Sequence, residues 1–251
     1  MVDAVISVEG LVKRYPEVTA VDDVTFAVPR GAIVGLLGGN GAGKTTTLGM
    51  LLGLVLPSAG RITILGEDMR RHRHRALARV NFTSPYVDLP ARLTARENLA
   101  VFATLFGVRD RHARIAELAE DLRLRAFLDR KAGSLSAGQK TRLGVAKALI
   151  NAPEVLLLDE PTASLDPDTG DWVRSYLERY RRERGASILL ASHNMLEVER
   201  LCDEVLMMKD GRIVDRGTPP ALIARHGRTT MEEVFLAIAR APSAARAEAA
   251  Q

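Results

Sequence analysis

The sequence predicts an α/β fold, with a mostly parallel sheet flanked by helices. An apolar run at residues 32–37 leads into a glycine-rich stretch and then into a segment that can start a helix. Two later runs, at 155–158 and 187–191, are apolar without alternation, which is typical of parallel strands buried on both faces. The residues from 88 to 150 show mainly helical periodicity. Strands alternating with helices are the signature of this fold class.

Two regions are expected to depart from the alternating core. Residues 5–28 have the pattern of two or three short strands before the turn signal Pro29-Arg30-Gly31, and predict an N-terminal antiparallel β subdomain. Residues 88–150 predict an inserted helical subdomain, in which Thr94 and Glu97 have the spacing of a capping box. Five apolar residues between 115 and 128 lie close to one helical face: Ile115, Leu118, Ala119, Leu122 and Leu124.

We expect a single domain over residues 1–240. Its core and β subdomain would occupy about 1–87 and 151–217, with the helical subdomain at 88–150 and short C-terminal helices at 218–240. The tail at 241–251 is rich in alanine and has too few large apolar residues to pack, so it is expected to be disordered.

Composition limits the classes of protein that are possible. The chain has 251 residues, of which 47% are hydrophobic and 26% charged, as in ordinary globular proteins. No apolar run reaches the ~20 residues that cross a bilayer. The start lacks the features of a secretory signal, and the single cysteine, Cys202, suits the cytosol and is expected to be a small buried hydrophobe.

A basic run at residues 70–75 is the sharpest cluster of charge. It could contact nucleic acid or lipid headgroups, but it is short and contains no aromatic residues, so we favour a solvated helix face. Outside this run, His112 and His226 have no functional setting in the sequence and are expected at the surface. Trp172 is expected to be a packing residue on a helix at 169–182.

The glycine-rich stretch fits the phosphate-loop pattern Gly-x4-Gly-Lys-Thr, in the strand-to-helix context that the pattern needs. Glycines allow positive φ, so that several N–H groups can point at one anion, and the following helix adds its positive dipole end. Lys44 would reach the β- and γ-phosphates of a nucleotide, and Thr45 would ligate Mg²⁺. The expected phosphate-binding residues are Gly38, Gly39, Asn40, Gly41, Ala42, Gly43, Lys44, Thr45 and Thr46.

Polar residues follow the two later apolar runs, at the sheet edge where ligands of such folds bind. Asp159 is placed to hold Mg²⁺ through water, and Glu160 to orient or deprotonate an attacking water. Paired acids at a strand end can also be only a turn, but the phosphate loop upstream favours the chemical role. His193 can contact a γ-phosphate or hold that water. A second anion-binding helix N-terminus is predicted within Leu135-Ser136-Ala137-Gly138-Gln139. The alternative is an ordinary serine cap, against which stands the presence of two separate γ-phosphate binders in one chain.

Taken in order, these motifs and Ser164-Leu165-Asp166 resemble the nucleotide-binding subunit of ABC transporters, over about residues 5–217. The resemblance implies that two subunits pair head to tail, with each ATP between the phosphate loop of one and residues 135–139 of the other. It assigns Glu160 as the catalytic carboxylate, His193 as the switch histidine and Asp166 to the loop between the sites. Tyr15, which alone would be a packing residue, matches the position that stacks on adenine.

Two departures from the family pattern stand out. Ala137 replaces a usual glycine, which is a mild change. Pro85 stands where the family has a glutamine that touches Mg²⁺ and the membrane partner, and either the neighbouring Ser84 or water would replace its contact. We therefore expect measurable but modest ATPase activity, above that of a Glu160→Gln variant.

The resemblance also implies partners. The end of the chain, with Met231-Glu232-Glu233-Val234-Phe235-Leu236, is similar to export ATPases of the ABC-2 class, which move drugs, lipids or polysaccharides through a separate membrane permease. We expect ATP and Mg²⁺ as cofactors and no nucleic acid as a partner. We expect a second ATPase subunit, with a homodimer favoured over a heterodimer. The chain would lie in the cytoplasm, on the inner face of the cell membrane, bound there through the permease. The alternative is a non-transport ABC ATPase acting on nucleic acid or ribosomes, which usually has coiled-coil insertions or tandem cassettes.

Overall fold

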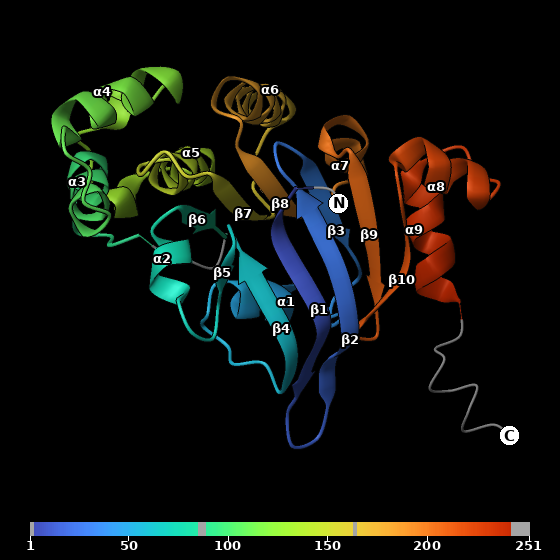
Figure 1. Ribbon diagram of the computed structural model, residues 1–251. Coiled ribbons are helices and arrows are strands. Elements are labelled where there is room, and N and C mark those ends of the chain that lie inside the picture. Colours follow the sequence, from blue (N-terminus) through green and yellow to red (C-terminus); the bar gives the residue numbers. More distant parts are fainter. Residues whose placement is uncertain (1–2, 85–88, 163–164, 242–251) are drawn as a thin grey trace, which may run out of the picture. The chain divides into compact units, whose positions relative to one another are not determined.

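The computed structural model describes residues 3–84, 89–162 and 165–241, and Figure 1 labels its helices and strands. The expectations for Pro85, Ser164 and the end of the tail lie outside these ranges. The chain forms two compact units: Met1–Arg73 with Leu189–Gln251, and His74–Ile188. The strand β8 (Ser187–Ala191) is fully buried and takes the chain from the second unit back to the first.

The first unit contains an antiparallel sheet in the order β2-β1-β4-β5. Its strands are β1 (Ala4–Arg14), β2 (Thr19–Pro29), β4 (Ala59–Ile64) and β5 (Glu67–Asp68). The antiparallel expectation is confirmed, but residues 5–28 form two long strands instead of two or three short ones, because β1 continues through Val12 and Lys13. Figure 1 shows β1 and β2 running side by side over their whole length.

The first unit also contains the strand-loop-helix element that the sequence predicts. All five residues of β3 (Ile33–Leu37) are buried, and α1 (Lys44–Leu51) follows the glycine-rich loop. β9 (Glu204–Lys209) pairs parallel to β3, and β10 (Arg212–Gly217) pairs antiparallel to β9. Three helices complete the unit: α7 (Met195–Leu201), α8 (Pro219–Arg225) and α9 (Met231–Arg240).

Cys202 shows how closely this region packs. The thiol is buried next to Gly35 of β3, where an added Cβ would lie 2.8 Å from the Cys202 sulfur. Burial raises the pKa of the Cys202 thiol, so the uncharged form is favoured. The expectation of a small buried hydrophobe is confirmed.

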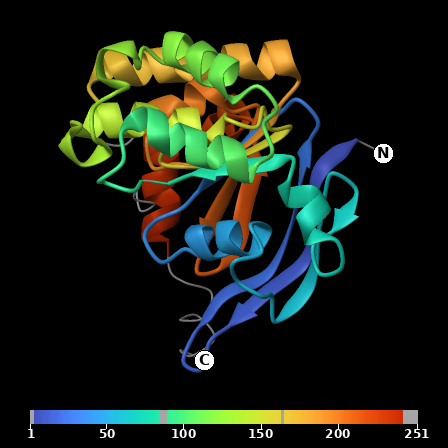
Figure 2. The same ribbon diagram turned by 90° about the vertical axis from the view of Figure 1, so that its left-hand side faces the viewer.

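The second unit contains the helical segment and two parallel strands, β6 (Val80–Thr83) and β7 (Val155–Asp159). Figure 2 shows its long helices, coloured green to gold, gathered together. The helices are α2 (Arg73–Leu77, beginning at the last residue of the first unit), α3 (Ala95–Leu105), α4 (Arg111–Asp121), α5 (Ala137–Ala148) and α6 (Pro167–Arg184), with short 3-10 turns at Arg125–Phe127 and Ala132–Ser134. The basic run around α2 is exposed, as expected of a solvated face.

Local signals in the second unit are mostly confirmed. Thr94 caps α3 in a capping box with Glu97. The apolar series from Ile115 is buried, but α4 ends at Asp121, because Arg123 takes a left-handed conformation with φ of 49° and turns the chain. Trp172 lies on α6 beside Tyr176, with the Arg123 guanidinium 5.2 Å from its ring centroid, and is a packing residue.

Candidate active site

The phosphate loop of the first unit is closely packed at two of its glycines, Gly38 and Gly43. Gly43, the N-cap of α1, has φ of 102°, and a Cβ there would lie 2.5 Å from the carbonyl oxygen of Ala20. A Cβ on Gly38 would overlap the carbonyl oxygen of Met208 at the end of β9. Glycine at these two positions lets the loop pack against neighbouring backbone, while Gly39, Asn40 and Gly41 stay exposed and available to an anion.

Hydrogen bonds hold the loop from within and from the β9–β10 turn. The Lys44 ammonium donates to the carbonyl oxygens of Gly38 at 2.6 Å and Gly39 at 3.1 Å, so it folds over the loop. The Gly211 N–H donates to the carbonyl oxygen of Ala42 at 3.1 Å. Thr45, at the first turn of α1, is exposed. This arrangement presents one ammonium group and a hydroxyl at the N-terminus of a helix.

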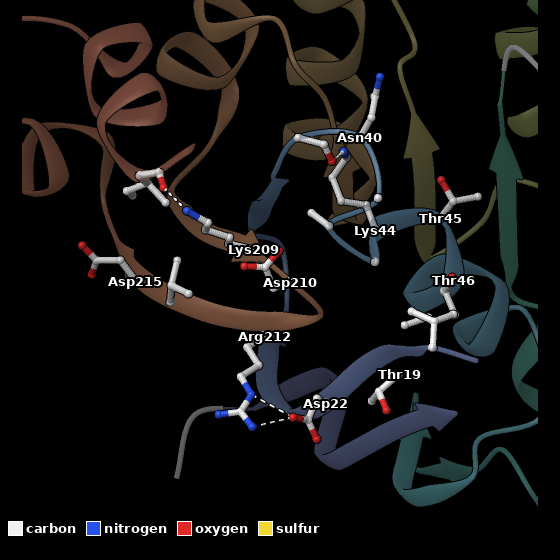
Figure 3. Close-up of a pocket in the computed structure, with 18 of the residues that line it drawn as sticks. Thr19, Asp22, Asn40, Lys44, Thr45, Thr46, Lys209, Asp210, Arg212 and Asp215 are labelled. Atoms are coloured by element: carbon white, nitrogen blue, oxygen red, sulfur yellow. Dashed lines mark hydrogen bonds and ion pairs between the residues drawn. The ribbon is translucent and has the colours of Figure 1, made fainter. Parts of the chain in front are cut away.

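A pocket of about 1140 Å³ opens over the loop, with every lining residue in the first unit (Figure 3). Asn40 and Lys44 project from the loop, and Lys209 and Asp210 come from the β9–β10 turn. Val18 and Thr19 line the side formed by the β1–β2 hairpin. The pocket is slightly larger than the about 300–1,000 Å³ common for small-molecule sites, so it has room for a nucleotide.

Tyr15 lies close to this pocket in sequence but is not one of its lining residues. It forms a tight hairpin turn with Val18, in which the Tyr15 N–H donates to the Val18 carbonyl oxygen at 2.8 Å. Its side chain is 43% exposed, and the Lys13 ammonium lies 4.8 Å from its ring centroid. One face of the ring is thus occupied by a cation, and the exposed part is accessible to solvent.

Charged residues that the sequence did not predict as site residues also line this pocket. Arg212 pairs with Asp22 at 2.5 Å, and Asp215 accepts from Arg225 and lies 2.8 Å from Nε2 of His226. Burial alone would raise the pKa of Asp215, but its hydrogen bond with His226 and the neighbouring cations lower it. His226 was expected at the surface, and its side chain is 26% exposed; its contact with Asp215 is a pairing that the sequence does not predict.

His193 follows β8 on a short segment that is fixed from both sides. The buried Ser192 hydroxyl donates to Glu197 at 2.6 Å and accepts from the Asn194 N–H at 3.1 Å. Asn194 also caps α7. The His193 side chain itself is exposed, so this segment presents an imidazole from a rigid turn.

In the second unit, β7 ends in the two acids that the sequence singles out. Asp159 is 7% exposed and accepts a hydrogen bond from the Ser84 hydroxyl at 3.1 Å. Glu160 has φ of 50°, a left-handed conformation that is costly for a non-glycine residue and is found at functional sites. Ser84 follows β6, whose register pairs Thr83 with Leu158 beside the acids.

The Leu135–Gln139 region forms the start of α5. Ser136 caps the helix in a capping box: its oxygen accepts from the Gln139 N–H at 3.3 Å, while Oε1 of Gln139 accepts from the Ser136 N–H at 3.0 Å. The Ser136 hydroxyl can still donate its own proton outward. A Cβ on Gly138 would lie 3.6 Å from Leu165, so the next loop passes close by.

Asp166 caps α6 by accepting from the Thr169 N–H at 3.0 Å. This backbone hydrogen bond is the main reason that the pKa of Asp166 is lowered. The residue therefore has a structural role at a helix start in addition to any role at a nucleotide.

Among the described residues, no group of three or more His, Cys, Asp or Glu side chains could hold a metal ion by itself. Mg²⁺ that is bound together with a nucleotide needs only one or two protein oxygens, because phosphates and water supply the rest. The sequence predicts Thr45 and Asp159 for that role.

Phosphate loop, parallel strands and paired acids define a phosphate-loop ATPase with an α/β fold. The chain matches the ABC transporter family over residues 21–163. It is 43% identical to the Nod factor export ATP-binding protein I of Ralstonia nicotianae over 253 residues, covering 98% of this chain and 78% of that protein. This chain belongs to the ABC transporter family, and it is an ATPase of that family.

Solved structures agree. A structure described as the ATP-binding subunit of an ABC transporter aligns with a TM-score of 0.86 and 28% identity, and the alignment covers 94% of this chain and 100% of that one. The dimeric structure of MJ0796, a bacterial ABC transporter cassette, aligns with a TM-score of 0.79 and 25% identity, covering 85% and 98%. Within the part of the chain described, no helix is both long and apolar enough to cross a membrane.

Proposed function

We propose that this chain binds ATP with Mg²⁺ in the first unit's pocket, hydrolyses it, and thereby drives a separate membrane permease that exports its cargo. The observation that carries the proposal is the pocket over the phosphate loop, whose glycine backbone cannot tolerate a Cβ at Gly38 or Gly43. A surface shaped in this way, at the start of a helix, suits phosphate oxygens.

In this proposal Lys44 leaves the carbonyl oxygens of Gly38 and Gly39 and turns to the β- and γ-phosphates. The N–H groups of the loop, from Gly39 to Thr46, bind the phosphate oxygens, and the Thr45 hydroxyl binds Mg²⁺. Tyr15 stacks on the base with its exposed ring, while Val18 and Thr19 contact the ribose side of the pocket.

Asp159 would hold Mg²⁺, which when bound neutralises charge developing on the phosphate oxygens. Ser84, the residue before Pro85, supports this role, because its hydroxyl donates a hydrogen bond to one carboxylate oxygen of Asp159. Glu160 orients or deprotonates the attacking water, and His193 contacts the γ-phosphate. These roles are electrostatic positioning, which is the main contribution of a protein to phosphoryl transfer.

We propose further that two copies of this chain pair, so that residues 135–139 of each copy face the phosphate loop of the other. The α5 start supports this, because the Ser136 hydroxyl keeps a donor for a phosphate after its capping bond is made. Asp166, close to Gly138 through Leu165, would sense the neighbouring site. The dimeric cassette among the structural relatives supports pairing, and identical copies are the simplest arrangement.

Export is the direction that the relative's name supports, since that protein is a Nod factor export ATP-binding protein. We propose a drug, lipid or polysaccharide as the cargo class. The permease would be another polypeptide, and this chain would lie on the inner face of the membrane against it. No nucleic acid is expected, and the exposed arginines around α2 are proposed to face solvent.

Binding is tested by calorimetry of the full chain with ATP and Mg²⁺. Lys44→Ala should weaken affinity about 10- to 100-fold, since it removes charge-assisted hydrogen bonds to phosphate. Lys131→Ala, which removes an exposed lysine from the second unit, is the matched control and should bind as the wild type does. Unchanged affinity in Lys44→Ala would overturn the proposed site.

Hydrolysis and coupling need separate measurements. Phosphate release should be slow but clearly above that of Glu160→Gln, and a rate equal to that variant would contradict an ATPase role. Purification of the chain from membranes in mild detergent should recover a polytopic protein. Recovery of nucleic acid or ribosomes in its place would support the non-transport alternative.

A further inference from the structure

Lys147 is a buried lysine in the last turn of α5, the helix that begins at Ser136. Only 5% of the residue is exposed. No carboxylate among the described residues forms an ion pair with its ammonium group, and burial lowers the pKa of Lys147 to about 8. A buried cation without a counter-ion is expensive, and lysine is almost never fully buried unless it is paired.

The ammonium group is instead held by the end of β6. It donates to the carbonyl oxygen of Phe82 at 2.8 Å. It also lies 4.2 Å from the ring centroid of Phe82 and 5.4 Å from that of Phe102 on α3. One carbonyl and two aromatic faces thus replace water around the charge.

Two further contacts make the junction between α5 and β6 tight. The side-chain amide of Asn81 donates to the Lys147 carbonyl oxygen at 3.2 Å, so the bonds run in both directions between the two elements. Gly144, one turn before Lys147, packs against Thr83 so closely that an added Cβ would lie 3.2 Å from the Thr83 hydroxyl. Side chains at 81, 82 and 83 are therefore all engaged by α5.

The next residue, Ser84, is the one that donates to Asp159 at 3.1 Å. β6 also pairs in parallel register with β7, which ends at Asp159. Because Ser84 is only two residues after Phe82, a displacement of Phe82 relative to α5 would also displace the Ser84 hydroxyl from Asp159. Errors of about 1 Å in the placement of catalytic groups can cost about 100-fold in rate.

We propose that Lys147 is a positioning residue for ATP hydrolysis, which ties α5 to the end of β6 and so holds Ser84 in place beside Asp159. This inference rests on the proposed function, and it adds a residue that supports the placement of Ser84. Lys147 acts through Ser84 and does not contact the nucleotide. It therefore affects the hydrolytic step and not the affinity of the phosphate loop.

The test is a double-mutant cycle on the full chain with Lys147→Met and Ser84→Ala, using kcat and KM for ATP. Lys147→Met should lower kcat about tenfold and leave KM within a factor of about two. Ser84→Ala should lower kcat similarly, and the double variant should be no slower than the slower single variant, since both act on one contact. Lys147→Arg keeps the charge and the donor and should recover most of the rate. Lys131→Met is the control that should behave as the wild type.

Amide hydrogen exchange at residues 82–84 provides a readout that does not depend on hydrolysis, and it should increase in Lys147→Met. A Lys147→Met kcat within a factor of about two of the wild type, or effects of the two single variants that multiply, would overturn the inference. If Lys147→Met does not fold, Lys147→Gln takes its place in the same cycle. The two proposals fail in different ways. A wild type that hydrolyses ATP no faster than Glu160→Gln would overturn the proposed function, and with it the role of Lys147 in hydrolysis. Raised amide exchange at residues 82–84 in Lys147→Met would still show that Lys147 holds the end of β6.

Discussion

The free energy of unfolding of this protein should depend on pH through Lys147. Its pKa is lowered by burial from 10.5 to about 8, so the folded chain releases this proton at a lower pH than the unfolded chain does. Between those two values the unfolded state binds more protons, and stability must therefore rise with pH. Below pH 8 the lysine is charged in both states, and its burial costs about 3 kcal/mol at about 1.4 kcal/mol per pKa unit.

Lys147→Met removes the titrating group and keeps an apolar chain of similar length. At pH 7 the methionine variant should be at least as stable as the wild type, because relief of the buried charge offsets the lost bond to the Phe82 carbonyl. From pH 7 to pH 9.5 the wild type should gain about 2 kcal/mol relative to the variant, as the cost of the charge falls.

The assay is urea unfolding followed by circular dichroism at pH 7.0, 8.5 and 9.5, with both proteins at each pH. Burial also raises the pKa of Tyr180 to about 12, but this group is present in both proteins and its contribution cancels in the difference. A difference in unfolding free energy that stays constant within about 0.5 kcal/mol over this range would refute the reasoning about the buried ammonium group.

Three other predictions concern single residues. Glu160→Gly should abolish hydrolysis and yet be about 1 kcal/mol more stable than Glu160→Gln, because glycine accepts the φ of 50° without strain; a less stable glycine variant in thermal unfolding would contradict this. Tyr15→Ala should weaken ATP affinity by about 1–3 kcal/mol and leave that of tripolyphosphate unchanged, while Tyr15→Trp restores it; equal losses for both ligands in calorimetry would argue against stacking. Lys209→Met should release the end of α9, where the ammonium donates to the carbonyl oxygens of Ile238 at 2.8 Å and Ala239 at 3.1 Å, at a cost of about 1 kcal/mol. Faster amide exchange over residues 231–240 would show the release, and unchanged protection would exclude it.

Short-range signals account for the parts of the fold and site that the sequence predicts well. The phosphate loop, the capping box at Thr94, and the fully buried β3 and β7 depend on neighbours within a few residues. Such patterns are visible in any single sequence because backbone φ, helix caps and strand burial are local properties. The strands and helix starts at these positions therefore appear in the structure where they were expected.

Longer-range pairings could not be predicted in this way. The contact between His226 and Asp215 is an example. The two residues are 11 positions apart, and nothing near His226 in the sequence indicates that its ring lies 2.8 Å from the Asp215 carboxylate. The end of α4 depends on the left-handed Arg123, which helical periodicity does not reveal.

The amino-acid sequence by itself determined the class of fold, the phosphate loop and the family, because these are written in local composition and spacing. Only the tertiary structure decided that Ser84 holds Asp159 and that Lys147 holds Phe82, since these partners are 75 and 65 residues apart along the chain. The physical reason is that a side-chain hydrogen bond depends on positions in space, and these positions are set by packing between elements far apart along the chain, such as α5 and β6.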